Sequence, residues 1–374
     1  MSGETGPRPS DRLPSRKLDH LRAALEFWRG EAPDEENPFD QLAFVHDALP
    51  EVDLEDVDTR VEFLGRNFSH PLVLSATTGG HPALGWFNEV VGALAEEFDV
   101  PVGVGSQRAA LEDEKLSFTF SAVRRRAPRA FVLANVGACQ LATHPEPEEL
   151  AARCVEMVRA DAVAVHLNAV QELLQPGGDA NFKGVVAALA KVVEHSNVPV
   201  LVKEVGCGIS GPVAAKLEAT GVAAVDVAGS GGTNFAAIEA RRAGQAASPW
   251  NSWGIPTPVA IAWCRKCCSL PLVGSGGVRH GLDVAKALAS GATVAGLSGA
   301  LLPHLLGHWP VDGDTPSNEF VAAAERSAGV FLARTCDQVR RVMAALGCRR
   351  VEHLYGKALV AFGRIREWRS QLAL

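Results

Sequence analysis

The sequence predicts an α/β protein, a (β/α)8 barrel of the TIM type with helical extensions at its N-terminal and C-terminal ends. Eight short apolar segments follow one another from Leu72 onward, and the stretches between them are long enough for crossover helices. Each segment is rich in β-branched residues and too continuously apolar for a half-exposed strand, which is typical of buried parallel strands. Eight such strand-helix units close into a barrel.

The expected strands are defined by their apolar runs and by the small and polar residues that end them. They cover residues 71–76, 100–106, 130–136, 161–168, 198–205, 223–229, 271–277 and 293–299. Gly, Ser, Asn, Lys, His and Gln collect at the carboxyl ends of these runs, where barrel enzymes build their active sites. Beyond the barrel, apolar residues recur at helical spacing from Asn318 until Gly347 stops the pattern, which predicts C-terminal helices.

The composition fits one large domain. The chain has 374 residues, of which 47% are hydrophobic and 21% charged, so on length alone one large domain with terminal extensions is as plausible as two. With the eight strand-helix units we expect a single domain over residues 16–374. Residues 1–15 are rich in Pro, Gly, Ser and charge, and are predicted to form a disordered tail. No apolar run could span a membrane and no signal peptide is visible at the start, which predicts a cytoplasmic protein without a membrane partner.

Charge and cysteine usage argue against two further classes. The net charge of −7 disfavours a nucleic-acid partner, because phosphate contacts need a clustered excess of Lys and Arg. The eight cysteines are scattered and do not suggest a disulfide framework. Cys264, Cys267 and Cys268 include a Cys-x-x-Cys pair, but no second pair follows at zinc-site spacing. We expect free thiols and no metal there.

Two glycine-rich turns follow the last two strands. Gly276 and Gly277 stand between a strand and a helix expected to open near Gly281, and the sequence GLSGALL repeats this arrangement after the eighth strand. Glycines let backbone amides approach a ligand, and helix N-termini attract anions, so the two turns predict a phosphate site. Tight-turn chemistry alone is the alternative.

Polar residues at the ends of the fourth and fifth strands indicate a ligand. His166, Asn168, Gln171 and Glu172 occur within seven positions after a buried strand. Alternatively, the first two cap the strand and the last two begin a solvated helix. Lys203 ends an apolar strand, and a buried unpaired ammonium is unfavourable, so we expect it to face developing negative charge such as that of a reduced flavin.

Several motifs together resemble one enzyme family. They are RKLDH at 16–20, TGG at 78–80, GVGSQRA at 103–109, HLNAVQE at 166–172, VKEVGCGIS at 202–210, GGTNF at 231–235, WGIPT at 253–257 and SGGVRHGLDVAKALA at 275–289. In this order they resemble the type II isopentenyl diphosphate isomerase family over nearly the whole chain. The resemblance implies interconversion of isopentenyl and dimethylallyl diphosphate with reduced FMN and Mg²⁺, NADPH as the reductant, and a homo-oligomer of four or more subunits.

The resemblance also implies three sets of site residues. The prenyl diphosphate is bound by Arg16, Lys17, His20, Arg108, Asn168 and Gln171. FMN is bound by Thr77, Thr78, Gly79, Ser106, Asn135, Lys203, Ser230, Thr233, Gly276, Gly277, Arg279, Leu297 and Ser298. The resemblance implies that Gln171, Lys203 and His166 are catalytic and that Glu172 binds Mg²⁺.

Some of these residues have a structural interpretation that the sequence leaves open. Residues 16–20 could be a basic helix start on the surface, and Arg108 could form a salt bridge at the barrel rim. Ser210 is a weaker candidate for the site. Asp226 is equally well explained as a buried structural carboxylate.

Three positions depart from the family pattern. Thr77 replaces the usual Met, Gly296-Leu297-Ser298 replaces the usual Gly-Met-Ala after the eighth strand, and Phe235 replaces a common Trp. They leave room for a homologue with an altered prenyl diphosphate substrate, or for a flavin-loaded or empty barrel without catalysis. A related FMN oxidoreductase of the 2-hydroxy-acid oxidase type is a further alternative, and it would use Arg279 and His280.

Overall fold

The computed structural model describes residues 13–29, 37–242, 249–309, 311 and 313–374. Most of the predicted N-terminal tail, residues 1–12, therefore lies outside the described residues. Helix α1 (Leu13–Trp28) begins inside the stretch that was predicted to be tail. None of the helices among the described residues is long and apolar enough to cross a membrane.

The predicted barrel is confirmed. Eight parallel strands close in the order β10-β11-β4-β5-β6-β7-β8-β9. They are β4 (Leu72–Leu74), β5 (Val102–Gly103), β6 (Val132–Gly137), β7 (Ala162–His166), β8 (Val200–Lys203), β9 (Ala224–Asp226), β10 (Leu272–Ser275) and β11 (Val294–Leu297). Closure pairs the first and last of these strands, with Leu74 beside Leu297. All eight carboxyl ends therefore meet at one mouth.

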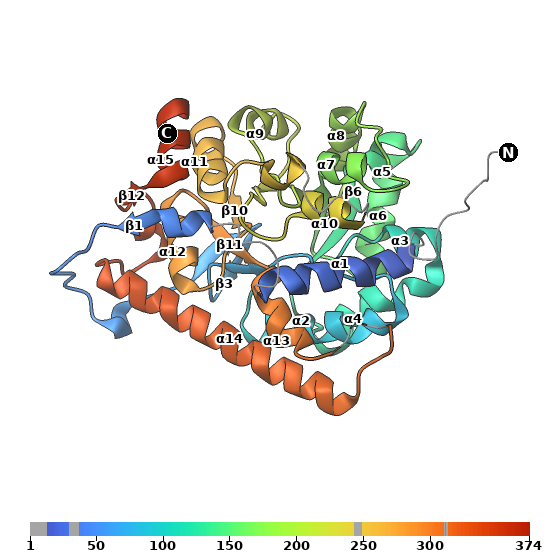
Figure 1. The fold of residues 1–374 in the computed structure, drawn as a ribbon, viewed down its shortest axis with the longest axis horizontal. Helices are drawn as coiled ribbons and strands as arrows, with labels where there is room; N and C mark the ends of the chain where they lie inside the picture. Colours follow the sequence, from blue (N-terminus) through green and yellow to red (C-terminus); the bar gives the residue numbers. More distant parts are fainter. Residues whose placement is uncertain (1–12, 30–36, 243–248, 310, 312) are drawn as a thin grey trace.

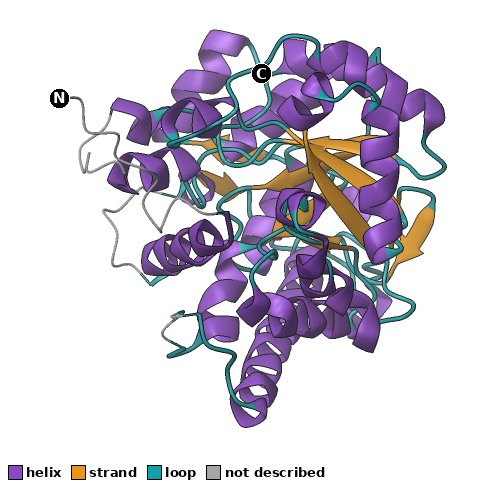
Figure 2. Ribbon diagram, turned by 90° about the vertical axis from the view of Figure 1, so that its right-hand side faces the viewer, coloured by secondary structure: helices purple, strands orange, loops and turns teal. Residues whose placement is uncertain are grey.

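Helices surround the strands, as Figure 2 shows. The longer ones around the barrel are α2 (Gly85–Glu97), α4 (Phe118–Arg126), α6 (Pro147–Val158), α8 (Val185–His195), α9 (Gly211–Glu218), α11 (Thr257–Cys267) and α12 (Gly281–Ala289). Short helices at or near the mouth are α3 (Arg108–Glu112), α5 (Ala138–Thr143), α7 (Ala169–Leu174), α10 (Phe235–Arg242) and α13 (Leu302–Leu306). The 3-10 turns are η2 (Pro38–Gln41), η3 (Leu54–Asp56), η4 (Pro82–Leu84), η5 (Glu114–Leu116), η6 (Pro249–Ser252), η7 (Gly299–Leu301) and η8 (Val351–Leu354).

The amino end of the barrel is closed by an apolar plug. The hairpin of β2 (Val61–Phe63) and β3 (Arg66–Phe68) places Phe63 and Phe68 against the inward side chains of the strands. Phe68 meets Phe131 edge-on, with ring centroids 5.5 Å apart. Both hairpin phenylalanines are only 1% exposed, so this end is a packed core.

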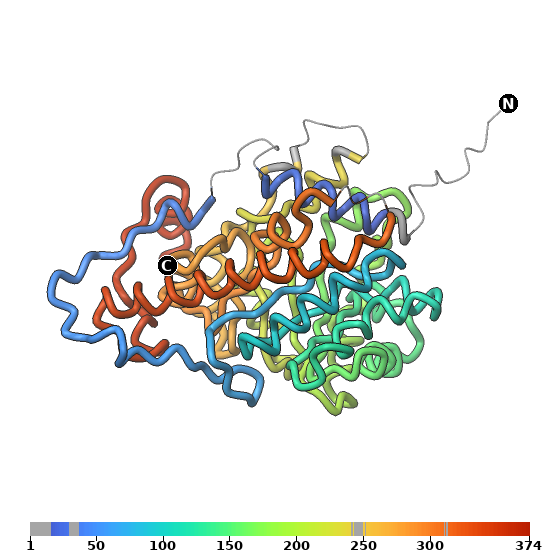
Figure 3. The backbone as a smooth tube through the Cα atoms, turned by 90° about the horizontal axis from the view of Figure 1, so that it is seen from below, coloured from blue at the N-terminus to red at the C-terminus, as the bar shows by residue number. Residues whose placement is uncertain are grey.

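Segments from the two ends of the chain pair on the barrel flank. Strand β1 (Leu42–Phe44) runs antiparallel to β12 (Leu359–Ala361), next to helix α15 (Gly363–Leu372). The predicted C-terminal helix is confirmed as α14 (Asn318–Ala345), which packs on α12 and α13 and runs along the side of the barrel (Figures 1 and 3). Near Gly347, whose φ is 66°, the chain leaves this helix.

Candidate active site

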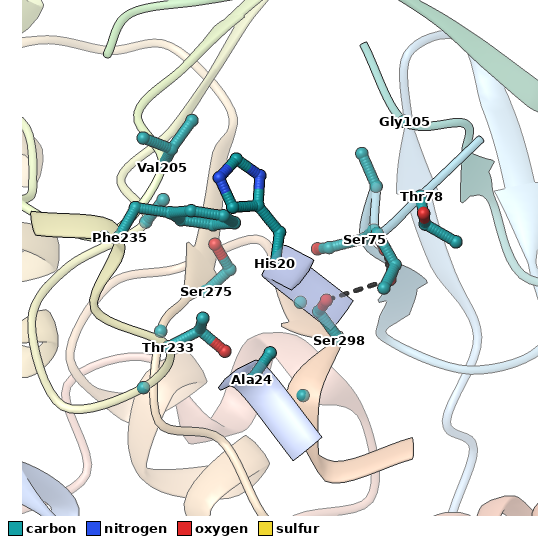
Figure 4. A pocket seen from close by; sticks show the side chains of 18 of the residues that line it. His20, Ala24, Ser75, Thr78, Gly105, Val205, Thr233, Phe235, Ser275 and Ser298 are labelled. Carbon is teal, nitrogen blue, oxygen red and sulfur yellow. Dashed lines mark hydrogen bonds between the residues drawn. The ribbon is translucent and has the colours of Figure 1, made fainter. Parts of the chain in front are cut away.

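One cavity lies at the carboxyl ends of the strands, covered in part by helix α1. Strand ends, the loops after them and α1 contribute its lining. In Figure 4, Val205 and Phe235 lie across the cavity from Ser75 and Thr78, with His20 of α1 between them. Of the residues predicted for the site, the following line it: Lys17, His20, Thr77, Thr78, Ser106, Asn135, His166, Gln171, Lys203, Thr233, Gly276, Gly277 and Ser298.

The other predicted residues lie around the cavity or away from it. Within the described part of the chain its lining does not include Arg16, Gly79, Arg108, Asn168, Glu172, Ser230, Arg279 or Leu297. Leu297 is fully buried in the barrel wall. Gly79 packs its backbone against the ring of Phe120, where a Cβ would not fit. Contacts of these residues with a ligand stay predictions.

The glycine corner has the backbone shape expected of an anion site. Gly276 and Gly277 have φ values of 103° and 78°, which favour glycine. A Cβ at Gly276 would overlap the carbonyl oxygen of Gly229. Ser298 precedes the 3-10 turn η7, and its side chain makes no capping hydrogen bond to the first amides of that turn.

Helix α1 reaches into this corner through Trp28. The indole Nε1 donates to Thr233 Oγ1 at 3.0 Å, and a Cβ at Gly299 would overlap the ring. Thr233 is one of the residues predicted to hold the FMN phosphate, so an anion bound there shares Thr233 with Trp28. Sequence reasoning missed Trp28, because the contact joins segments 205 residues apart.

Two hydroxyl groups fit a polar ligand in this cavity. Ser75 Oγ and Thr78 Oγ1 are buried and have no hydrogen-bond partner among the described residues. Buried polar groups are normally paired, so these two favour a ligand with hydrogen-bonding groups. The hydroxyls, the glycine corner and Lys203 are together compatible with the ribityl, phosphate and ring parts of FMN. Ser75, which precedes the predicted threonines, was missed.

Lys203 is held at the cavity by its neighbours. Its Nζ donates to Glu204 O at 2.5 Å, and the side chain is 8% exposed. The carboxylate of Glu204 accepts the N–H groups of the next four residues, which fixes the loop after β8. Asp226 accepts from Ser275 Oγ at 2.5 Å, and burial raises its pKa while Lys203 opposes that shift. Asp226 thus has the structural role that the sequence left open.

A buried polar network supports His166 from behind. Its Nδ1 lies 2.8 Å from Asn135 Oδ1, and Asn135 Nδ2 donates to Val104 O at 3.0 Å. Gln107 bonds the backbone of Asn135 in both directions, at 2.7 and 2.9 Å. Burial, followed by the charges of Lys203 and Lys17, lowers the pKa of His166 to about 3. The imidazole is therefore neutral at physiological pH.

Helix α7 presents the amide of Gln171 to the cavity, with the side chains of Asn168 and Glu172 beside it. Asn168 Nδ2 donates to Gln171 Oε1 at 3.2 Å and to Glu172 Oε1 at 2.8 Å. Glu172 Oε2 accepts from Asp179 N at 2.6 Å and from Gln175 Nε2. Only Gln171 of this group lines the cavity. The predicted arrangement of amides beside one carboxylate is present.

A single carboxylate is compatible with Mg²⁺ only if the ligand completes the shell. The described residues contain no group of three or more His, Cys, Asp or Glu side chains that could hold a metal. Mg²⁺ commonly takes one or two carboxylates together with phosphate oxygens and waters. Oε1 of Glu172 accepts one hydrogen bond and keeps a lone pair for an ion. The residues fit Mg²⁺ held jointly with a bound diphosphate.

Three cations gather beside the cavity on α1 and α3. Burial, then the charges of Arg16 and Arg108, lower the pKa of Lys17 to about 8. Burial also lowers the pKa of Arg16, while Glu239 opposes that shift. Arg108 forms an ion pair with Glu112 at 2.8 Å, as in the rim salt bridge that the sequence left open. Mutually repelling cations at a cavity favour an anionic ligand.

His20 has a buried carboxylate partner that sequence reasoning missed. Its Nε2 lies 2.5 Å from Glu239 Oε1, and Arg242 donates to the other oxygen at 2.8 Å. Burial raises the pKa of Glu239, but His20 and Arg242 outweigh it and hold the pKa below its usual range. Burial lowers the pKa of His20, so a neutral ring donates to a carboxylate. Glu239 follows GGTNF by four positions, and a carboxylate on that helix was the available signal.

The basic residues of the glycine loop, Arg279 and His280, are engaged with carboxylates and with a helix start. Arg279 Nη2 donates to Asp40 Oδ1 at 2.6 Å, and its Nε lies 3.3 Å from Asp283 Oδ2. His280 caps α12 by accepting from Asp283 N at 3.3 Å. Neither residue lines the cavity that the described chain forms. The predicted contact of Arg279 with FMN stays a prediction.

The departures at 77 and 298 form one contact. Thr77 Oγ1 lies 3.0 Å from Ser298 Oγ, as the dashed line at Ser298 in Figure 4 shows. Phe235, the third departure, meets the ring of His20 edge-on at 5.6 Å. The hydroxyl groups of Thr77 and Ser298 thus hydrogen-bond to each other, at two positions where the family pattern has apolar side chains.

Comparison with known proteins assigns the chain to a family. No protein-family model matches it. The chain is 40% identical over 359 residues to the isopentenyl-diphosphate delta-isomerase of Archaeoglobus fulgidus, with 94% of this chain and 97% of that protein covered. It is 38% identical over 375 residues to the enzyme of the same name from Aeropyrum pernix, with 98% and 93% covered. This chain belongs to the isopentenyl-diphosphate delta-isomerase family.

Solved structures agree on the fold of this isomerase-family enzyme. A lactate oxidase from Pediococcus acidilactici aligns with a TM-score of 0.64 at 15% identity, covering 92% of this chain and 94% of that chain. A mandelate oxidase with a monooxide FMN adduct aligns with a TM-score of 0.61 at 16% identity, covering 94% and 98%. At such identities the likeness shows the (β/α)8 fold alone, which is consistent with the type II form of the isomerase family.

Proposed function

We propose that this isomerase interconverts isopentenyl and dimethylallyl diphosphate with reduced FMN and Mg²⁺ bound. One observation carries the proposal: the glycine corner at Gly276 and Lys17 line the same cavity. Two anionic groups, a cofactor phosphate and a substrate diphosphate, thus each have a separate place in one site. The motifs and the named relatives support the same activity.

The substrate diphosphate would bind beside helix α1. Lys17 has an ammonium made unfavourable by burial and by Arg16 and Arg108, and a bound dianion relieves that repulsion. Asn168 and Gln171 add uncharged donors that bind an anion without a competing negative charge. Glu172 would bind Mg²⁺ together with the phosphate oxygens.

The cofactor would be held by residues from many strand ends. Thr78, Ser106, Asn135 and Lys203 suit the flavin ring and ribityl chain, and the corner at Gly276 and Ser298 suits the phosphate. Reduced FMN supplies an electron-rich ring that assists proton transfer at carbon without net oxidation. Lys203 would offset negative charge on that ring, and Gln171 would position the reacting carbon.

Isomerisation needs a proton added to the terminal alkene carbon and another removed from the carbon two positions away, and ordinary side chains do this poorly at unactivated carbon. The cavity residues contribute orientation and exclusion of water. We expect NADPH to be the physiological reductant and the enzyme to be a cytoplasmic tetramer or larger oligomer. Size-exclusion chromatography with light scattering tests the latter.

The decisive experiment is anaerobic. Protein loaded with FMN is incubated with a reductant, Mg²⁺ and isopentenyl diphosphate in deuterated water, and the product is followed by NMR. We expect deuterated dimethylallyl diphosphate, and an activity loss of about 100-fold or more in Glu172→Gln that excess Mg²⁺ restores only in part. Glu149→Gln, an exposed carboxylate at the start of α6, is the matched control and should keep full activity.

Bound FMN without isomerisation would overturn the proposal and point to the departures at 77, 235 and 298. The oxidase alternative is tested in a separate aerobic sample that holds oxidised FMN and no added reductant, with lactate or mandelate as the substrate. We expect no substrate-dependent hydrogen peroxide, because Arg279 is paired with Asp40 and His280 caps a helix, so both residues are engaged outside the cavity lining.

A further inference from the structure

One predicted catalytic residue, His166, has two ring nitrogens to which the proposed function assigns no separate roles. The imidazole lines the cavity at the end of β7, and the side chain of Asn135 on β6 meets it from the next strand. His166 and Asn135 are 8% and 4% exposed. The contact between Nδ1 and Oδ1, at 2.8 Å, is therefore shielded from water.

The orientation of the Asn135 amide follows from its other contact. Asn135 Nδ2 donates to Val104 O at 3.0 Å. If the amide were turned over, its oxygen would face the oxygen of Val104, and two acceptors would oppose each other. The amide oxygen therefore faces His166. An amide oxygen can only accept, so Nδ1 of His166 must carry the proton.

The second ring nitrogen is then left with a lone pair. Burial, then the nearby charges of Lys203 and Lys17, lower the pKa of His166 to about 3, although a hydrogen bond to the backbone of Val136 acts in the opposite direction. The neutral ring has one proton, and Nδ1 holds it. A Cβ at Gly137 would lie 3.2 Å from Nε2 and 2.9 Å from Gln140 Oε1, so glycine at this position leaves room for both side chains.

We propose that Asn135 is a positioning residue that fixes His166 as the Nδ1–H tautomer, so that Nε2 serves the cavity as a hydrogen-bond acceptor. Gln107 holds Asn135 in place. Its Oε1 accepts a hydrogen bond from Asn135 N at 2.7 Å, and its Nε2 donates to Cys154 O at 2.9 Å. Asn135 acts on the chemistry through His166, in addition to any contact of its own with a ligand.

The tautomer decides which group His166 can bind. A neutral Nε2 repels a phosphate oxygen and accepts an N–H or O–H donor. Resting on the proposed function, this assigns His166 to an N–H of the reduced cofactor rather than to the ionised diphosphate. The diphosphate is left to Lys17 and the cations beside it.

The tautomer can be measured without any turnover. The full chain, loaded with FMN, is labelled with ¹⁵N-histidine in a deuterated background, and long-range ¹H–¹⁵N spectra are recorded from about pH 6 to pH 8. Loss of one spin system in His166→Gln assigns the residue. We expect a protonated Nδ1, an unprotonated Nε2 and no titration in this range.

Two substitutions at Asn135 separate positioning from packing. Asn135→Leu removes the acceptor, and we expect the Nδ1–H pattern to be lost and kcat to fall at least about tenfold, since a wrong tautomer disables a catalytic histidine. Asn135→Asp keeps an acceptor and adds a charge, so the pattern should persist while the pKa of His166 rises and the pH profile shifts. The aspartate variant also keeps the proposal testable if the leucine variant does not fold.

Asn88→Leu is the matched control. Asn88 is another buried amide, 1% exposed, whose Nδ2 donates to the carbonyl oxygens of Thr78 and Thr119. It should alter stability and leave the His166 spectrum unchanged. A protonated Nε2 in the wild type, or an unchanged His166 spectrum in Asn135→Leu, would overturn the proposal. Absence of isomerase activity would count against the proposed function only.

Discussion

The two ends of the barrel are built from the same strands, but they differ in whether their buried groups are paired without a ligand. At the amino end, Phe63 and Phe68 of the β2–β3 hairpin pack into an apolar cluster with the inward side chains of the strands. At the carboxyl end, Ser75 and Thr78 keep buried hydroxyls without a partner among the described residues. Glycines with left-handed backbone and the buried ammonium of Lys203 lie at that same end.

Packing at the amino end stabilises the fold, whereas the carboxyl end is less stable until a ligand binds. Apolar side chains stabilise the fold by leaving water, and they need no ligand to do so. Buried ammonium groups and unpaired hydroxyls are unfavourable until a ligand pairs with them. Substitutions at the amino end should therefore act on unfolding, and those at the carboxyl end on binding and turnover.

Breaking the plug should have the largest effect. Phe68→Ala removes a ring that is 1% exposed and is expected to lower the free energy of unfolding by about 3–5 kcal/mol. Urea unfolding followed by circular dichroism measures this. The folded fraction should bind FMN as the wild type does. Val360→Ala, at a side chain 45% exposed, should change stability by less than about 0.5 kcal/mol. If Phe68→Ala weakened FMN binding and left the free energy of unfolding unchanged, the two ends would not have the separate roles described above.

A substitution at the carboxyl end should reduce activity and leave the free energy of unfolding nearly unchanged. Gln171→Ala should lower the isomerase rate about 100-fold, because an oriented group at the reacting carbon is lost. The free energy of unfolding should change by less than about 0.5 kcal/mol, since the side chain is not part of the core. The rate assay and urea unfolding are run on the same preparation, with exposed Gln371→Ala as the control. A large loss of stability in Gln171→Ala would show that this residue also stabilises the fold.

Proton titration sharpens the comparison at one residue. The pKa of Lys17 is lowered to about 8 by burial, Arg16 and Arg108, so its charge is lost as pH rises through that value. Affinity for inorganic diphosphate, measured by calorimetry, should therefore fall about tenfold between about pH 7 and pH 9. Lys17→Arg stays charged and corrects for titration of the ligand itself. An equal pH dependence in both proteins would remove Lys17 from the anion site.

The smallest effect is expected where two departures from the family pattern meet. Thr77→Val and Ser298→Ala each remove one hydroxyl of a pair whose oxygens lie 3.0 Å apart. In a double-mutant cycle on the free energy of unfolding, the coupling should be about 0.5–1.5 kcal/mol. Strictly additive effects would mean that the two hydroxyls do not depend on each other. The cycle also shows whether this polar pair stabilises the mouth in the absence of ligand.

Local features of the sequence determined the barrel and much of the site. A buried strand, a glycine turn and a helix start are set by neighbouring residues, so the eight apolar runs and the turn at Gly276 could be identified without coordinates. The same holds for the helix that begins at Asn318. Lys203 and His166 could be placed at the mouth because the ends of parallel strands meet there.

Which side chains from distant parts of the sequence meet depends on the tertiary structure. His20 finds Glu239 across 219 positions, Thr77 finds Ser298 across 221, and Arg279 turns to Asp40 across 239. Each partner is chosen by barrel closure and by the path of α1 and η2 over the mouth, which no local pattern contains. A hydrogen bond depends on distances of a few tenths of an ångström, whereas the apolar period in the sequence reports only which face is buried.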